Sequence, residues 1–303
     1  MARAGWLTVF LLVAAGGVSE QVAQVSLAPR LIVEAPPQLA PAAERIRSLA
    51  PERLTDAARL AGLTDPGPPI RVVLAPEGSP LALQVPPWIS GFADPAAGVV
   101  VLLPARAPSF PDSSLEDLLR HEVAHVLIGR AAGGRPLPRW FHEGLAMIAG
   151  LSWGLEERSR LTMALFADAP VSLDELDRRF GGDQGMVQRA YTVAGAFVRD
   201  LVQRHGPEVT GKILAGVAAG LPFDEAFRRA TGTSVGAAAK SFWERQTFWY
   251  RWVPLLTSSV TLWLLVTALA LWAMRKRRAR DAALRRMWEE EEERKAPPPL
   301  QLK

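Results

Sequence analysis

The first hundred residues alternate between short apolar runs and longer polar or helix-like stretches. Runs of β-branched and other apolar residues, bounded by Pro or Gly, predict three strands at 30–36, 70–76 and 98–105. Between the first two strands, 41–63 carries Ala, Leu, Arg and Glu at helical spacing, with an interruption at Pro51. This pattern predicts a small α+β module, with a loop and hairpin leading into the third strand.

From Ser113 onward, the apolar residues take the spacing of helices. Ser113, with Glu116 three residues later, predicts a capping box at the start of a helix, and Gly129 predicts its end. Pro138 suits the first turn of a second helix. Further helical patterns lie at 155–167, 187–205, 208–219, 222–231 and 234–250. We therefore expect a mainly helical part after the small module.

Two apolar segments lie near the ends of the chain. Residues 1–19 contain Arg3, an apolar run and then small residues, which is typical of a secretory signal peptide, with an uncleaved anchor as the alternative. Residues 253–274 have no charged side chain and would cover ~33 Å as a helix, enough to cross a bilayer. Aromatic residues precede this segment and the cations of 275–280 follow it, which favours a membrane span over a buried helix.

The positive net charge is confined to the C-terminal tail. The whole chain of 303 residues has 35 Lys and Arg against 31 Asp and Glu, a net charge of +4. Residues 275–303 contain ten Lys and Arg against six Asp and Glu, which is also +4, so the rest sums to zero. This distribution removes the main support for nucleic-acid binding and favours contact with anionic lipid. The chain has no cysteine, so a metal site must use His and carboxylate ligands.

The pentapeptide HEVAH at 121–125 carries the candidate chemistry. In a helix, His121 and His125 lie one turn apart on one face, so both imidazoles can bind one metal ion, and Glu122 flanks that face. Such an HExxH pattern is a zinc-protease signature, in which the glutamate takes a proton from water. An exposed charged turn is the alternative. The apolar neighbours in LLRHEVAHVLIG favour a buried metal site, because burying these polar side chains without a partner is costly.

A second motif, PRWFHEGLA at 138–146, follows shortly after HEVAH. Together the two resemble the gluzincin metallopeptidases, and in particular the peptidase MA-like group, whose pattern is HExxH and then P-x-W-x-x-E-G-x-A. The matching residues are Pro138, Trp140, Glu143, Gly144 and Ala146. The resemblance covers about 90–243. It implies a zincin-like domain, a zinc ion and Glu143 as the third zinc ligand.

Two neighbours of Glu143 qualify that assignment. His142 is the competing third ligand, but adjacent helical residues point about 100° apart, so only one of the two can face the metal. Met147 lies four residues after Glu143, where better-known gluzincins have an aspartate. The usual hydrogen-bond partner of the first histidine, His121, must therefore come from elsewhere or be absent.

Three further features bear on the site, and for the first two a structural interpretation stands beside the functional one. Tyr191 lies where related gluzincins often keep a hydrogen-bond donor to the oxyanion, although packing between helices explains a tyrosine equally well. His205 precedes Gly206 at a predicted helix end, which favours a partner of the helix dipole over an active-site acid. By the resemblance, residues 99–104 are expected to form an edge strand that pairs with an extended peptide.

These features predict an α+β fold with a small N-terminal β-containing module, a mainly helical zincin-like domain and one C-terminal transmembrane helix. The expected parts are a signal peptide (1–19), the α+β part of a peptidase domain (20–110), its helical part (111–250), the span (253–274) and a cytoplasmic tail (275–303).

The predicted function is that of a zinc metalloendopeptidase-like hydrolase, anchored in a bacterial envelope membrane with its catalytic domain outside the cytoplasm. It would act on peptide or protein substrates and contact membrane lipid, but not nucleic acid. The catalytic residues are Glu122 and Tyr191, and the Zn²⁺ ligands are His121, His125 and Glu143. The alternative is a zinc-stabilised, inactive scaffold or interaction domain, and a regulatory protein acting through its tail is a weaker one.

Overall fold

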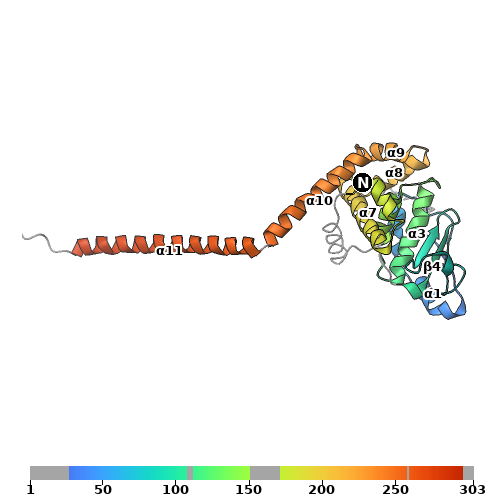
Figure 1. The fold of residues 1–303 in the computed structure, drawn as a ribbon, viewed down its shortest axis with the longest axis horizontal. Coiled ribbons are helices and arrows are strands. Elements are labelled where there is room, and N and C mark those ends of the chain that lie inside the picture. The colour runs from blue at the N-terminus through green and yellow to red at the C-terminus, as the bar shows by residue number, and fades with distance from the viewer. Residues whose placement is uncertain (1–26, 108–111, 151–170, 258, 296–303) are drawn as a thin grey trace, which may run out of the picture.

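The computed structural model describes residues 27–107, 112–150, 171–257 and 259–295. The predicted signal peptide and the predicted helix at 155–167 lie outside these residues. Figure 1 shows a body of packed helices and one small sheet, from which a long helical extension leads away. α10 (Val235–Thr257) begins in the body, where Phe242 and Trp243 belong to its apolar core, and then leads into the extension with α11 (Ser259–Lys295).

One four-stranded sheet has the strand order β1-β2-β4-β3. Its strands are β1 (Leu31–Glu34), β2 (Ile70–Leu74), β3 (Gly91–Asp94) and β4 (Val99–Leu102). β1, β2 and β4 run parallel, and β3 returns antiparallel to β4 through the expected hairpin. The prediction that 99–104 forms an edge strand is therefore wrong. Val100 and Leu102 of β4 are fully buried, as suits an interior strand, and β3 forms the edge.

Short helices connect the strands. α1 (Ala40–Arg47) ends before Pro51, where a 3₁₀ turn η2 (Pro51–Leu54) leads into α2 (Thr55–Leu60), as the interruption at this proline predicted. The other 3₁₀ turns are η1 (Pro37–Leu39), η3 (Ala82–Gln84) and η4 (Pro104–Arg106). Buried residues of α1 and α2 belong to the same apolar core as those of β2 and β4, so these helices cover the sheet.

The helix that carries HEVAH is α3 (Leu115–Ala131), which continues two residues beyond its predicted end. Its N-cap is Ser114 and not Ser113, because the Ser114 hydroxyl accepts a hydrogen bond of 3.0 Å from the Asp117 backbone N–H. Glu116, which was predicted to close the capping box, instead forms an ion pair with an arginine of α1. The cap is therefore shifted by one residue from its predicted place.

The remaining helices of the body are α4 (Arg139–Gly150), α6 (Leu173–Arg179), α7 (Gln184–His205), α8 (Val209–Ala218) and α9 (Phe223–Thr231). α4 packs on both α3 and α7. Gly144 permits this close approach, since a Cβ there would lie 2.5 Å from the Ala194 carbonyl oxygen of α7. α6 was missed in the sequence pattern because seven residues contain too few turns to show a period.

A glycine crossing joins the N-terminal module to the C-terminal helices. Gly62 follows α2 with a φ of +72°, and a Cβ there would lie 2.8 Å from the Gly211 Cα of α8. Beside this crossing, the Thr210 hydroxyl donates a hydrogen bond of 2.5 Å to the Leu60 carbonyl oxygen. The two segments share one apolar core, so the described residues of the predicted parts 20–110 and 111–250 form a single packed body.

The predicted membrane span at 253–274 is not found, which corrects both the predicted fold class and the predicted location. Among the described helices, none combines the length and the apolar character needed to cross a membrane. Within the described residues, the apolar run belongs to the end of α10 and the start of α11, and residue 258 between them lies outside the described residues. The described residues form a mainly helical chain with one small sheet.

Candidate metal centre

Two helices bring three potential metal ligands together. His121 and His125 lie one turn apart on α3, and their Nε2 atoms are 3.2 Å apart. Oε2 of Glu143, on α4, lies 3.3 Å from Nε2 of His125 and 3.8 Å from Nε2 of His121. Tetrahedral zinc with ligand bonds of about 2.0–2.1 Å would hold two ligands roughly 3.4 Å apart. The three side chains therefore form a group that could hold a metal ion.

The buried carboxylate of Glu143 also fits a bound cation. Its Oε2 atom has no hydrogen-bond partner within the described part of the chain. Burial by itself raises the pKa of Glu143, but His125 and His121 outweigh it and hold the pKa well below its usual value. A buried, ionised oxygen without a hydrogen bond is costly, and a metal ion in contact with it would remove that cost.

Packing and capping hold α4 in the position that Glu143 requires. At its C-terminal end, Gly150 lies against α3, where a Cβ would be 3.0 Å from the His121 backbone nitrogen. At its N-terminal end, the Asp177 carboxylate of α6 accepts a hydrogen bond of 2.7 Å from the Trp140 N–H. α4 is thus fixed at both ends relative to the helix that carries the histidines.

His142 lies behind His125 and not with the three potential ligands. Its Nε2 atom is 3.3 Å from Nδ1 of His125. When Nε2 of a histidine binds a metal, its Nδ1 carries a proton and needs an acceptor. Burial and then the nearby His125 lower the pKa of His142 to about 4, so His142 is neutral at pH 7 and can accept that proton. The arrangement suits support of His125 better than direct metal binding.

Glu122 lines a cavity beside the metal group. Glu122 is only 6% exposed. This burial raises the pKa of Glu122 to about 7, although the nearby His125 and His121 act to lower it. β3 passes close by, because a Cβ on Gly91 would lie 3.2 Å from Oε1 of Glu122. A carboxyl group with a pKa near neutrality can both take up and release a proton under physiological conditions.

His121 is surrounded by carboxylates. Burial lowers the pKa of His121, but the negative charges of Asp112, Glu143 and Glu122 outweigh this effect and raise the pKa to about 9. The metal-free site therefore holds a proton on this histidine at pH 7. A metal ion that binds Nε2 must displace it.

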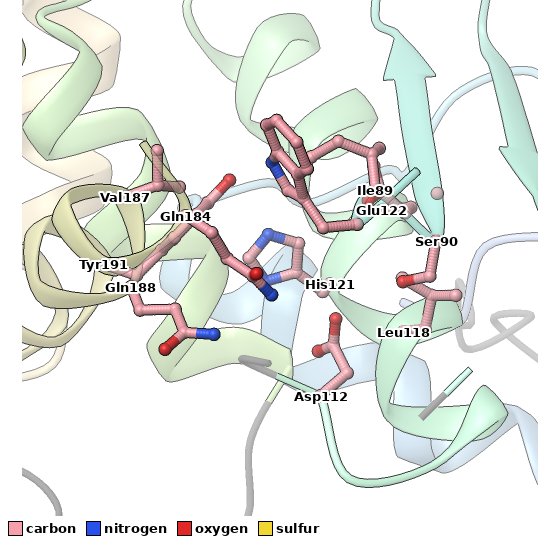
Figure 2. Close-up of a pocket in the computed structure, with 12 residues that line it drawn as sticks. Ile89, Ser90, Asp112, Leu118, His121, Glu122, Gln184, Val187, Gln188 and Tyr191 are labelled. Carbon is pink, nitrogen blue, oxygen red and sulfur yellow. The ribbon is translucent and has the colours of Figure 1, made fainter. Parts of the chain in front are cut away.

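Tyr191 of α7 reaches the same cavity as His121 and Glu122 (Figure 2). Its ring centroid is 6.0 Å from that of His121 and 5.2 Å from that of Phe180. Burial, followed by the charges of Glu143 and Glu122, raises the pKa of Tyr191 well above its usual value, so the phenol keeps its proton. The structure thus places a hydrogen-bond donor at the site, while the ring also packs between helices.

No protein-family model matches this chain. No curated protein matches it either. The likeness to gluzincins therefore rests on the two motifs alone, and the metal group on the geometry of its side chains.

His205 has the helix-end position that its sequence predicted. α7 ends at His205, and Gly206, with a φ of +89°, forms the C-cap. Within the described residues, His205 does not belong to the group that could hold a metal.

Several polar residues of the cavity were missed in the sequence: Ser90, Asp112, Gln184 and Gln188. They come from the segment before β3, the segment before α3 and the start of α7, as Figure 2 shows. Such separate segments share no spacing that a pattern could reveal. Asp112 alone carried a local signal, a charge just before a helix, and this signal is the same as that of an ordinary helix start.

Proposed function

We propose that this protein is a zinc-dependent metallopeptidase. The observation that carries the proposal is the position of Glu122, in a cavity directly beside the group formed by His121, His125 and Glu143. Two imidazoles and one carboxylate, with one coordination position left open, make up the ligand set of many catalytic zinc sites. The resemblance to gluzincins supports the same metal and the same reaction class.

The side chains of the cavity divide the chemistry between them. Zinc, when bound, supplies a Lewis acid that polarises the peptide carbonyl and a water. Glu122 takes the proton of the attacking water and delivers it to the leaving amine, a role that its buried position in the cavity suits. The protonated Tyr191 hydroxyl donates a hydrogen bond to the oxygen on which negative charge develops.

The free edge of β3 is the expected docking strand for the peptide. Among the described strands, β3 pairs only with β4, so its other edge offers backbone groups to an extended chain. Gly91, at the start of β3, lines the cavity together with Glu122 and His121. A peptide paired with this edge would therefore pass the metal group, and backbone pairing would make few demands on its side chains.

The substitution Glu122→Gln tests the proposal. It should leave zinc content and melting temperature near those of the wild type, because Glu122 is not among the ligands. Hydrolysis of a mixed peptide library should fall by at least ~10²-fold, since an amide cannot accept the proton. Zinc is measured by metal analysis and hydrolysis by mass spectrometry of the digest.

Glu52→Gln is the matched control, because Glu52 is exposed on η2 and carries no role in the site. It should leave hydrolysis unchanged. Equal hydrolysis by the wild type and by zinc-loaded Glu122→Gln would contradict the mechanism. A wild type that binds zinc but cleaves nothing in a broad library would favour the scaffold function.

A further inference from the structure

The first potential ligand, His121, has a ring nitrogen without a partner. Its Nε2 atom faces His125 and Glu143, so Nδ1 lies on the other side of the ring. Nδ1 is buried and has no hydrogen-bond partner among the residues that the structure describes. A histidine that binds a metal through Nε2 must place the Nδ1 proton on an acceptor, or its orientation and basicity suffer. His125 has such a neighbour in His142, whereas no described residue forms a hydrogen bond with Nδ1 of His121.

Among the described residues, Asp112 has a buried acceptor oxygen that lacks a hydrogen-bond donor, as Nδ1 of His121 lacks an acceptor. The residue is 5% exposed, and its Oδ1 atom is buried without a hydrogen-bond partner in the described parts of the chain. Burying a carboxylate oxygen without a hydrogen-bond donor costs free energy, so we expect a nearby group to donate a hydrogen bond to Oδ1. Figure 2 shows the carboxylate directed into the cavity, on the same side as His121.

The other acidic groups near His121 are already engaged. Glu143 belongs to the metal group, and Glu122 faces the cavity as the proposed base. The Asp117 carboxylate accepts hydrogen bonds from Ser113 and Arg120. Met147, at the position where an aspartate would be expected from the resemblance, offers no acceptor of comparable strength.

Asp112 and His121 line one cavity that has room for water. The cavity offers about 40 Å³ to the centres of water molecules. One water needs roughly 10–15 Å³ by this measure, together with two or more polar partners. The Nδ1–H of His121 and Oδ1 of Asp112 are such partners, so one water can join them where they do not meet directly.

We infer that Asp112 is the acceptor for the Nδ1–H of His121, directly or through one water, and that it orients the first metal ligand. Asp112 is thus a positioning residue, and it takes the place of the carboxylate that Met147 cannot supply. The inference rests on the proposed metal site, but it does not depend on peptide hydrolysis.

Zinc affinity is the primary test, measured by competition with a chelator. Asp112→Ala should raise the zinc Kd by roughly 10- to 100-fold, the usual effect of removing such a partner. Asp112→Asn keeps one acceptor oxygen and should raise the Kd less. Asp56→Ala, which removes an exposed carboxylate from α2, should leave the Kd unchanged.

The imidazole of His121 gives a second measurement that does not depend on activity. In zinc-loaded wild type, nitrogen-15 NMR should show a protonated, slowly exchanging Nδ1 on His121, and in Asp112→Ala this proton should exchange rapidly. If Asp112→Ala does not fold, Asp112→Asn is measured instead, with its metal-free melting temperature as the check on folding.

An unchanged Kd and an unchanged Nδ1 proton in the folded variants would overturn the inference while leaving the metal site intact. A wild type that fails to bind zinc would overturn the metal site itself. A wild type that binds zinc tightly but cleaves no peptide would refute the peptidase, and the role of Asp112 would still be decided by the Kd.

Discussion

The hydroxyl of Tyr191 separates a catalytic role from a packing role. Tyr191→Phe keeps the ring contacts with Phe180 and His121 but removes the donor. If the hydroxyl stabilises developing charge, kcat for peptide hydrolysis should fall on the order of 10²-fold with little change in KM. The melting temperature and zinc content should stay unchanged. If Tyr191→Phe has the kcat of the wild type, the role of Tyr191 is packing and not catalysis.

The raised pKa of His121 predicts that zinc affinity depends on pH. The folded, metal-free protein holds a proton on this histidine up to about pH 9, compared with a usual value near 6.5. Zinc must displace that proton, so the apparent affinity should rise by up to tenfold per pH unit below pH 9. Chelator competition between pH 6.5 and 8.5 measures the slope. A flat profile would show that His121 is already neutral.

The raised pKa of His121 also determines whether the stability of the metal-free protein rises or falls with pH. Because the folded pKa of His121 lies above the unfolded one, its stabilising contribution is complete below about pH 6.5. That contribution is lost as the pH rises through about 9. Thermal melts in a chelator over this range would show the loss.

Among the helices, α4 depends on a cap that another helix supplies. Asp177 of α6 accepts hydrogen bonds from the backbone N–H groups of Trp140 and Arg139, at the start of the helix that carries Glu143. Asp177→Ala should therefore lower the free energy of unfolding by about 1 kcal/mol. Because the cap lies one turn before Glu143, we also expect the zinc Kd to rise several-fold. Urea titration and chelator competition measure the two effects.

The matched control for this prediction is Asp174→Ala. Asp174 is an exposed residue in the first turn of the same helix, α6, and makes no contact with the start of α4 that the structure records. This variant should leave the zinc Kd unchanged. Equal zinc affinities for Asp177→Ala and Asp174→Ala would show that the cap does not position Glu143.

Elements with strong local signals were predicted well. The spacing of HEVAH placed His121 and His125 on one helical face, and Pro51 marked the break between α1 and α2. Local signals predicted the exact ends of helices less well. Two serines in succession can each cap α3, and only the hydrogen bond from Asp117 to Ser114 decides between them. The short α6 had too little sequence to show a period, yet its Asp177 caps α4.

Features that depend on the whole chain were predicted less well. The order of strands places β4 inside the sheet, which follows from pairing partners far apart in sequence and not from the composition of the strand. The apolar run 253–274 has a composition typical of a span, yet no described helix has both the length and the apolar character that a span needs. Asp112 and His121 line one cavity only because the fold brings the segment before α3 against it.

The crossing of Gly62 with Gly211 has a consequence for the order of events during synthesis. Leu60 and its hydrogen-bond partner Thr210 are 150 residues apart. At a translation rate of 5–20 residues per second, roughly 8–30 s pass between the emergence of α2 and that of α8. During this interval the small module lacks the helix that closes its core. The nascent chain therefore exposes apolar surface until α8 arrives, which makes it a candidate client for ribosome-associated chaperones.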